Sequence, residues 1–247
     1  MRAHLAAPLV AAGFLTAVPF PSVATPAAAF PRALAYFPVV GIAIGLVAAA
    51  TDVLVSRVLP AGVVAAVDLG ALALLTGGLH LDGLADSIDG LFVSGDRERR
   101  LAVMREGAIG AFGAAGVAII LLAEYGALAA LAAAEREVAL IAGAALARWC
   151  MVLAVWWFPY AREAGAGAAF KRGLGWRQGI AASVIAAAVA VAAGPHAVAA
   201  AAFSVIGIWA LGRWASRKLG GLTGDVYGAC GELAFLVTLV AWVAALR

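Results

Sequence analysis

The stretch IGAFGAAGVAIILLAEYGALAALAA, residues 109–133, decides the fold class of this chain, because it contains a single charged side chain, Glu124. A helix needs about 20 consecutive apolar residues to span the hydrocarbon core of a bilayer. We therefore expect residues 109–133 to form a transmembrane helix. Charged groups are costly in lipid, so the few charges of such a chain indicate where its function lies.

The composition of all 247 residues agrees with this interpretation, since 65% are hydrophobic and only 13% are charged. An ordinary soluble domain has ~25% charged residues. The composition excludes a disordered chain, and it leaves too little polar surface to cover a soluble globule. Further spans are expected at residues 34–59, 138–158, 180–193, 197–211 and 226–246, with one long helical stretch at 63–93 and a shallow or re-entrant helix at 5–20. We predict one all-α polytopic membrane domain over residues 1–247, with about seven to eight transmembrane or re-entrant helices in one bundle.

The basic residues predict the orientation of this bundle. If residues 94–106 face the cytoplasm, alternating spans put twelve basic residues on that side: Arg32, Arg97, Arg99, Arg100, Arg105, Arg162, Lys171, Arg172, Arg177, Arg213, Arg217 and Lys218. The opposite side receives Arg57, Arg136 and Arg247, with residues 135–137 and 60–62 as turns there. Cytoplasmic loops of membrane proteins carry such an excess. The net charge of +3 therefore reflects topology, and we expect no nucleic-acid partner.

An acidic cluster lies in the sequence HLDGLADSIDG, residues 80–90. Asp82, Asp86 and Asp89 stand at positions i, i+4 and i+7, which places them within an arc of about 60° on one helix face. Close carboxylates repel one another, and a hard divalent cation such as Mg²⁺ relieves that repulsion. The alternative is a solvated helix end outside the membrane. His80 is about 160° from Asp82 around the same helix, so a supporting role is expected for it rather than metal ligation.

A second acidic sequence, GGLTGDVYG at residues 220–228, opens the last span. Asp225 has two possible roles. Its carboxylate either interacts favourably with the dipole at that helix N-terminus, or it supplies a fourth metal ligand from another helix. The glycines would let backbone N–H groups face a phosphate. Glu232 is seven residues further along, hence on the same face about 10 Å deeper. It is expected to line the cavity or to pair with a buried base.

Cations that suit a phosphate group lie on the same predicted side of the membrane. Arg105 follows the aspartates, and Lys171 stands in a glycine-rich loop. Bases of this kind recognise phosphate and pyrophosphate, although the topology alone also explains them. Arg148 differs because it lies inside an apolar run. It either acts at a functional site within the bundle or pairs with an acid such as Glu124 on the preceding span.

Aspartates on a membrane helix with nearby bases indicate metal-dependent phosphoryl transfer at the cytoplasmic interface. One alternative is a lipid-headgroup enzyme of the CDP-alcohol phosphotransferase type. Residues 86–90 fit the start of its D-x-x-D-G pattern, but Val93-Ser94 stands where that pattern has Ala-Arg, and its later aspartates are missing. Another alternative is a cation transporter, which would place acids near mid-bilayer on several helices.

A more specific resemblance runs through the whole chain. Its motifs are FLTAVPFP at 14–21, YFPVVG at 36–41, GGLHLDGLADSIDG at 77–90, Met104-Arg105-Glu106, Ala147-Arg148-Trp149, Pro159-Tyr160-Ala161-Arg162 and GLTGDVYG at 221–228. With these motifs in this order the sequence resembles the cobalamin synthase family, the adenosylcobinamide-GDP ribazoletransferases. Glu106 departs from the family pattern, which usually has Asp there.

The resemblance implies a transferase of cobalamin biosynthesis in a bacterial inner membrane, with its site facing the cytoplasm. Adenosylcobinamide-GDP and α-ribazole, or its 5′-phosphate, would give adenosylcobalamin, or its 5′-phosphate, and GMP. The expected Mg²⁺ ligands and catalytic residues are Asp82, Asp86, Asp89 and Asp225, one of which would accept the hydroxyl proton. The expected substrate-binding residues are Arg105, Arg148, Arg162, Lys171, Glu232 and His80. The lipid bilayer is an expected partner, and a homo-oligomer or association with other corrinoid-assembly enzymes is left open.

Overall fold

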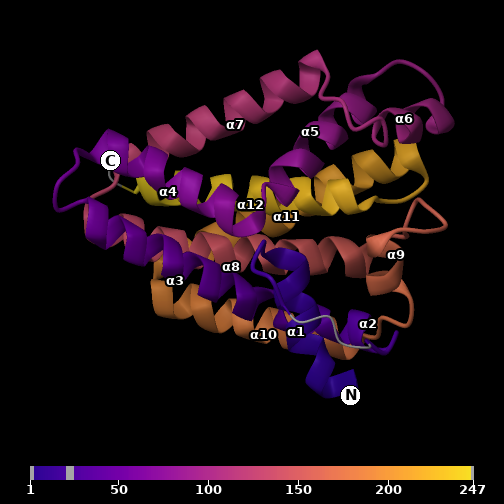
Figure 1. The fold of residues 1–247 in the computed structure, drawn as a ribbon, viewed down its shortest axis with the longest axis horizontal. Coiled ribbons are helices and arrows are strands. Elements are labelled where there is room, and N and C mark those ends of the chain that lie inside the picture. Colours follow the sequence, from indigo (N-terminus) through magenta and orange to yellow (C-terminus); the bar gives the residue numbers. More distant parts are fainter. Residues whose placement is uncertain (1–2, 21–24, 246–247) are drawn as a thin grey trace.

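The computed structural model describes residues 3–20 and 25–245, and this part of the chain is helical, with no strand (Figure 1). The long helices are α3 (Phe37–Val55), α4 (Ala61–Thr76), α5 (Leu79–Phe92), α7 (Ala111–Ala130), α8 (Ala133–Trp157), α10 (Trp176–Ala193), α11 (Pro195–Leu219) and α12 (Gly224–Ala244). The shorter ones are α1 (Ala3–Leu15), α2 (Ala29–Ala33), a 3₁₀ turn η1 (Leu34–Tyr36), α6 (Arg97–Val103) and α9 (Ala166–Lys171). Pro21, the last residue of the motif at 14–21, and the basic residue Arg247 lie outside the described residues.

Six helical stretches of the described chain are long and apolar enough to cross a membrane. They are Ala29–Val55 and the helices α7, α8, α10, α11 and α12. The bent pair α4 and α5 makes a seventh if it counts as one span, and α1 adds a shorter apolar helix. The prediction of an all-α polytopic membrane protein is therefore confirmed, and the eighth segment is a short helix rather than a full span.

Helices α4 and α5 correct one prediction, because residues 63–93 do not form one continuous helix. The two helices meet at an angle of 90°. Gly77 and Gly78 both have left-handed backbone angles, with φ of 62° and 69°. Residues with a Cβ adopt this conformation only at an energetic cost, so consecutive glycines allow the sharp turn. The break turns the aspartate-bearing helix α5 out of line with α4.

Helix α8 forms the centre of the bundle, because most of its residues are buried, and Figure 1 shows α12 and α3 on either side of it. Gly41 and Gly45 of α3 lie directly against α8, and a Cβ at either glycine would overlap the backbone near Ala144 or Ile141. This spacing of small residues allows close helix packing, which drives helix association in membranes, where burial of apolar groups contributes little.

The start of α8 differs from the prediction of a turn at residues 135–137. These residues form the first turns of the helix, and Arg136 is buried rather than part of a loop. Its guanidinium pairs with the Asp52 carboxylate of α3, and Nε lies 3.6 Å from Asp68 of α4. Because a buried charge requires a partner, this cluster joins three helices at one end of the bundle.

A second difference concerns the basic segment at residues 212–224, where a loop was expected. Helix α11 continues through it to Leu219, so Arg213, Arg217 and Lys218 belong to the last turns of a helix. Lys218 donates from Nζ to the carbonyl of Leu91 at 2.9 Å, and Arg100 donates to the same carbonyl at 2.6 Å. Cations are favourable at a helix C-terminus, and here they hold the end of α5.

Candidate active site at the α5–α12 crossing

The two acidic motifs meet where α5 crosses α12. A Cβ on Gly83 of α5 would lie 2.9 Å from the carbonyl oxygen of Asp225. A Cβ on Gly228 of α12 would lie 3.3 Å from Cα of His80. The glycines thus let the two backbones touch, which side chains at these positions would prevent. This contact brings Asp82 and Asp225, 143 positions apart in sequence, to the wall of one cavity.

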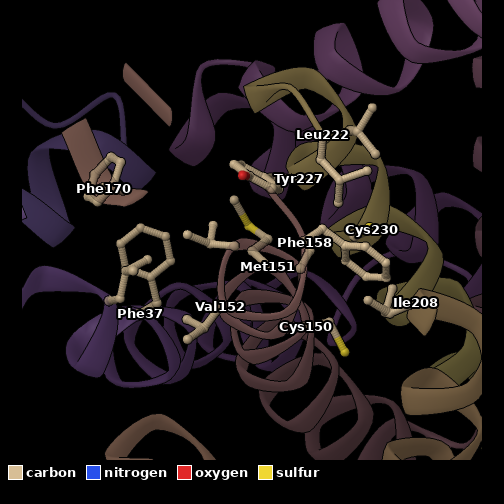
Figure 2. Close-up of a cluster of buried hydrophobic side chains, with 14 of the residues drawn as sticks. Phe37, Cys150, Met151, Val152, Phe158, Phe170, Ile208, Leu222, Tyr227 and Cys230 are labelled. Atoms are coloured by element: carbon tan, nitrogen blue, oxygen red, sulfur yellow. The ribbon is translucent and has the colours of Figure 1, made fainter. Parts of the chain in front are cut away.

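This cavity has a volume of about 180 Å³ and two chemically different parts. Asp82, Asp225, Arg162 and His80 line it with charged or polar groups. Its other walls are mainly apolar and aromatic, formed by Phe14, Leu34, Phe37, Met151, Val155, Phe170 and the rings of Tyr160 and Tyr227. Figure 2 shows Phe37 and Phe170 on one side of this region, with Tyr227 and Met151 on the other.

An ion pair joins the α12 motif to the loop after α8. Arg162 donates from Nη2 to Oδ2 of Asp225 at 2.8 Å, and only 14% and 21% of the two side chains are exposed. Backbone hydrogen bonds fix the loop to the start of α12, since Leu222 donates to Pro159 at 2.8 Å and Ala161 donates to Leu222 at 2.8 Å. The partly buried setting makes this pair stronger than an exposed one. It places a guanidinium beside the acids.

Asp86 and Asp89 share helix α5 with Asp82 but have different surroundings. The negative charges of Asp82, Asp225 and Asp89 all act on Asp86, and Arg162 is the cation that offsets them. Asp89 instead accepts hydrogen bonds from the backbone N–H groups of Gly110 at 2.7 Å and Gly113 at 2.8 Å. A carboxylate is favourable at a helix N-terminus, so Asp89 anchors the start of α7.

The residues around the cavity have side chains that can bind Mg²⁺, but they do not form a complete metal site by themselves. Among the described residues no group of three or more His, Cys, Asp or Glu is arranged to hold a metal ion by itself. Mg²⁺, however, is usually bound by one or two carboxylates, with water and substrate phosphates as its other ligands. Asp82 and Asp225 line the cavity, and Asp86 is coupled to both by charge. The donor set therefore fits the ion.

The two cations expected to bind phosphate differ in their surroundings. Lys171, at the end of α9, donates from Nζ to the carbonyls of Val155 at 2.7 Å and Trp156 at 3.2 Å. It therefore binds the C-terminal carbonyls of α8, and burial lowers the pKa of its amine below the usual value. Arg105 is exposed, and its backbone N–H donates to the carbonyl of Ala102 at 2.8 Å, whereas its guanidinium has no hydrogen bond or ion pair to the described residues. Its charge acts on nearby Tyr160.

The remaining charged residues expected at the site lie beneath it, inside the bundle. Glu124, Arg148, Glu232 and His80 line a second cavity of about 30 Å³. Neither Glu124 nor Glu232 forms an ion pair with Arg148 within 4.0 Å among the described residues, although the charge of Glu232 acts on both Arg148 and Glu124. His80 also lines the larger cavity, so its ring forms part of the wall between the two.

Sequence reasoning did not assign a role to two groups of residues, a tyrosine pair at the larger cavity and two buried acids near Arg136. Tyr160 and Tyr227 stack with ring centroids 6.2 Å apart and line the larger cavity. Both lie within motifs noted above, but their roles depend on helix packing. Burial raises the pKa of the Tyr160 hydroxyl, which keeps it neutral. Asp52 and Asp68 are single acids within apolar runs, a signal that could have identified the buried cluster with Arg136.

Comparisons with known proteins agree with the arrangement of these motifs. A family model described as cobalamin-5-phosphate synthase matches residues 7–243. The adenosylcobinamide-GDP ribazoletransferase of Ralstonia pickettii (strain 12J) is 38% identical, over 98% of this chain and 98% of its own length. The enzymes of the same name from Roseiflexus sp. (strain RS-1) and Klebsiella pneumoniae (strain 342) are 38% and 36% identical, over 92% and 85% of this chain and 85% and 88% of their own lengths.

No solved structure matches this chain. The family model covers both acidic motifs, and its match favours this family over the CDP-alcohol phosphotransferases and the cation transporters. The chain belongs to the cobalamin-5-phosphate synthase family, and it is a multi-pass membrane transferase of cobalamin biosynthesis.

Proposed function

We propose that this enzyme joins adenosylcobinamide-GDP to α-ribazole, or to α-ribazole 5′-phosphate, at the cytoplasmic face of the bacterial inner membrane, in a Mg²⁺-dependent reaction. The observation that carries the proposal is the meeting of Asp82 and Asp225 at one cavity, with Arg162 paired to Asp225 at 2.8 Å. Phosphoryl transfer from a pyrophosphate needs this combination of metal-binding acids and a fixed cation.

The chemistry is a displacement at the phosphorus attached to cobinamide. The ribazole hydroxyl oxygen forms a new bond to this phosphorus, the phosphoanhydride bond to GMP breaks, and GMP leaves with the bridging oxygen. One carboxylate of the Asp82, Asp86 and Asp225 group accepts the proton of the attacking hydroxyl. Arg162, held in place by its ion pair, stabilises the negative charge that develops on the phosphoryl oxygens.

Mg²⁺ held by Asp82, Asp86 and Asp225 would neutralise the pyrophosphate and favour departure of GMP. Asp89 supports the site indirectly, because both of its oxygens bind the start of α7 and its charge acts on Asp86. Arg105 is exposed, and we propose that its guanidinium binds the second phosphate. Arg148 and Glu232 act from below through His80, which lines both cavities.

The distribution of cations supports the cytoplasmic face. Helices α6 and α9 lie at the same end of the bundle in Figure 1, and they carry Arg97, Arg99, Arg100 and Lys171. The ends of α5 and α11 are bound there by Lys218 and Arg100. An excess of Lys and Arg is typical of cytoplasmic segments. The acidic site lies beside this basic end, through the Arg162–Asp225 pair.

Release of GMP by purified protein in phospholipid nanodiscs tests the proposal. We expect GMP from adenosylcobinamide-GDP only when α-ribazole and Mg²⁺ are both present, and loss of activity with EDTA that added Mg²⁺ restores. Asp82→Asn and Asp86→Asn should each lower kcat by about 10²-fold or more. Glu137→Gln, at the opposite end of α8, is the matched control and should keep full activity. Full activity of both aspartate variants would exclude this metal site.

A further inference from the structure

The apolar part of the larger cavity has no role in the phosphoryl transfer described above. It is built from aromatic rings of five different segments: Phe14 of α1, Phe37 of α3, Phe170 of α9, and the stacked pair of Tyr160 in the loop after α8 and Tyr227 of α12. The Phe14 and Phe170 ring centroids are 4.7 Å apart at 58°, and those of Phe37 and Phe170 are 5.5 Å apart at 75°. Rings at such angles present faces and edges to a flat ligand.

The size of the cavity restricts what it can hold. Pockets for drug-sized ligands measure about 300–1,000 Å³, so a cavity of about 180 Å³ takes a smaller group. A corrin macrocycle is far too large for it, whereas a bicyclic aromatic ring is of the right order. The two substrates of the proposed reaction offer three flat rings of this size: the base of the ribazole, and the guanine and the adenine of adenosylcobinamide-GDP.

The polarity of the walls distinguishes these rings. Guanine and adenine each carry several donors and acceptors on their edges, and each of these groups lowers the affinity if it is buried without a partner. The charged groups of the cavity are the acids and Arg162, which the phosphates and the attacking hydroxyl require. The walls formed by Phe37, Phe170 and Met151 offer nothing that could pair with guanine or adenine. A base of low polarity is therefore the better match.

Tyr227 adds one polar group to this apolar part. Its side chain is 4% exposed, and its hydroxyl has no hydrogen-bond partner among the described residues. Buried hydroxyl groups are nearly always hydrogen-bonded, so this donor points to a ligand with a complementary acceptor. The free ring nitrogen of a benzimidazole is a single acceptor of this kind. The single donor of Tyr227 therefore matches the single acceptor of such a base.

We propose that this cavity is the subsite for the aromatic base of the ribazole, with the base between Phe37 and Phe170 on one side and Tyr227 on the other. The Tyr227 hydroxyl donates to the free ring nitrogen, and the ribose points toward Asp82 and Asp225. This inference rests on the proposed function and assigns a binding place to the base of its nucleoside substrate. It also gives a purpose to the motifs at residues 14–21 and 36–41, which supply Phe14 and Phe37.

The test compares three nucleosides as acceptors: the α-ribosides of 5,6-dimethylbenzimidazole and of guanine, and a phenyl riboside that lacks the ring nitrogen. For the wild-type enzyme we expect kcat/KM to be at least about tenfold lower with guanine than with dimethylbenzimidazole. Tyr227→Phe should lower kcat/KM about three- to tenfold for the benzimidazole riboside and leave the phenyl riboside unchanged. Phe170→Leu should lower kcat/KM for both the benzimidazole riboside and the phenyl riboside.

Matched controls are Tyr125→Phe on α7 and Phe203→Leu on α11, which lie outside the cavity, at side chains 39% and 64% exposed. Neither should change the preference among bases. The ratio of kcat/KM for two nucleosides in one preparation does not depend on the fraction of folded enzyme, so a destabilised variant still gives a result. An unchanged ratio of kcat/KM between the benzimidazole and phenyl ribosides in Tyr227→Phe would overturn the proposal.

Wild-type protein provides a second test that needs no variant. Free 5,6-dimethylbenzimidazole should inhibit competitively against α-ribazole and noncompetitively against adenosylcobinamide-GDP. Competition against adenosylcobinamide-GDP alone would instead assign the cavity to guanine or adenine. If wild-type protein releases no GMP at all, the proposed function fails, but equilibrium dialysis of radiolabelled dimethylbenzimidazole riboside still decides the subsite. Binding to wild-type and weaker binding to Phe170→Leu supports it, and equal binding to both rejects it.

Discussion

At the scale of single residues, the structure divides the basic side chains into those that bind protein and those available to a substrate. Lys171 donates to two carbonyls at the end of α8, and Lys218 and Arg100 bind the end of α5. Arg162 pairs with Asp225, whereas Arg105 is exposed and its guanidinium has no protein partner in the described chain. The sequence shows only that these residues share one side of the membrane.

We therefore expect opposite effects from substitutions of Lys171 and Arg105, on stability for the first and on substrate binding for the second. Lys171→Met should destabilise the fold by about 1–2 kcal/mol, since a hydrogen bond from a charged group is lost at a partly exposed site. Its KM for adenosylcobinamide-GDP should stay unchanged. Arg105→Gln should leave the unfolding temperature unchanged and raise that KM about threefold to tenfold. Thermal unfolding and steady-state GMP release on the same preparations measure both. A raised KM in Lys171→Met with normal stability would contradict the assignment.

At the scale of elements, glycines determine how the aspartate-bearing helix is placed. Gly77 and Gly78 permit the 90° turn between α4 and α5, and Gly83 permits contact between α5 and α12. Helix periodicity predicted one long helical stretch at residues 63–93, and its second part is helical as α5. Periodicity did not predict the break, because both glycines stand inside a run that is otherwise helical in pattern.

Gly83→Ala tests the importance of the α5–α12 contact. A methyl group there would lie 2.9 Å from the Asp225 carbonyl oxygen and would push the two helices apart. Displacement of catalytic groups by about 1 Å can lower rates about 10²-fold, and we expect a loss of this order in kcat. Gly70→Ala on α4 is the matched control, since a Cβ there has no neighbour within 4 Å. It should retain activity, and equal activity of the two variants would show that the contact is dispensable.

At the scale of the whole molecule, charged groups mark both ends of the bundle. The acidic cavity and the basic helices lie at one end, and the buried cluster of Arg136, Asp52 and Asp68 lies where α3, α4 and α8 meet near the other. The second cluster is 0% to 2% exposed and has no access to substrate. We infer that it stabilises the bundle, and we propose that the acidic cavity at the other end performs the chemistry.

Arg136→Met should therefore affect folding rather than catalysis. Removing one partner of a buried ion pair costs about 3–5 kcal/mol, because the remaining carboxylates are left buried without a counter-charge. We expect a large drop in unfolding temperature and in yield, with an unchanged KM in the folded fraction. Combining it with Asp52→Leu and Asp68→Leu should recover part of the stability. A normal unfolding temperature for Arg136→Met would show that the cluster is not a structural clamp.

The sequence by itself determined the fold class, the helical placement of the aspartates and the family. These follow from local properties: apolar runs long enough to span lipid, helical periodicity, and short motifs that need no partner to be recognised. The approximate positions of the spans followed in the same way. The exceptions are the break between α4 and α5, and the charged segments at residues 135–137 and 212–219, which were expected in a turn and a loop but belong to helices.

Only the tertiary structure decided which of these residues act together. It brought Asp82 to Asp225, turned Asp89 to the N-terminus of α7, and bound Lys171 to the end of α8. It also gathered Phe14, Phe37, Phe170 and Tyr227 from four segments into one cavity wall. Such groupings depend on how helices cross, and that is set by close contacts at Gly83, Gly41 and Gly45 between segments far apart in sequence.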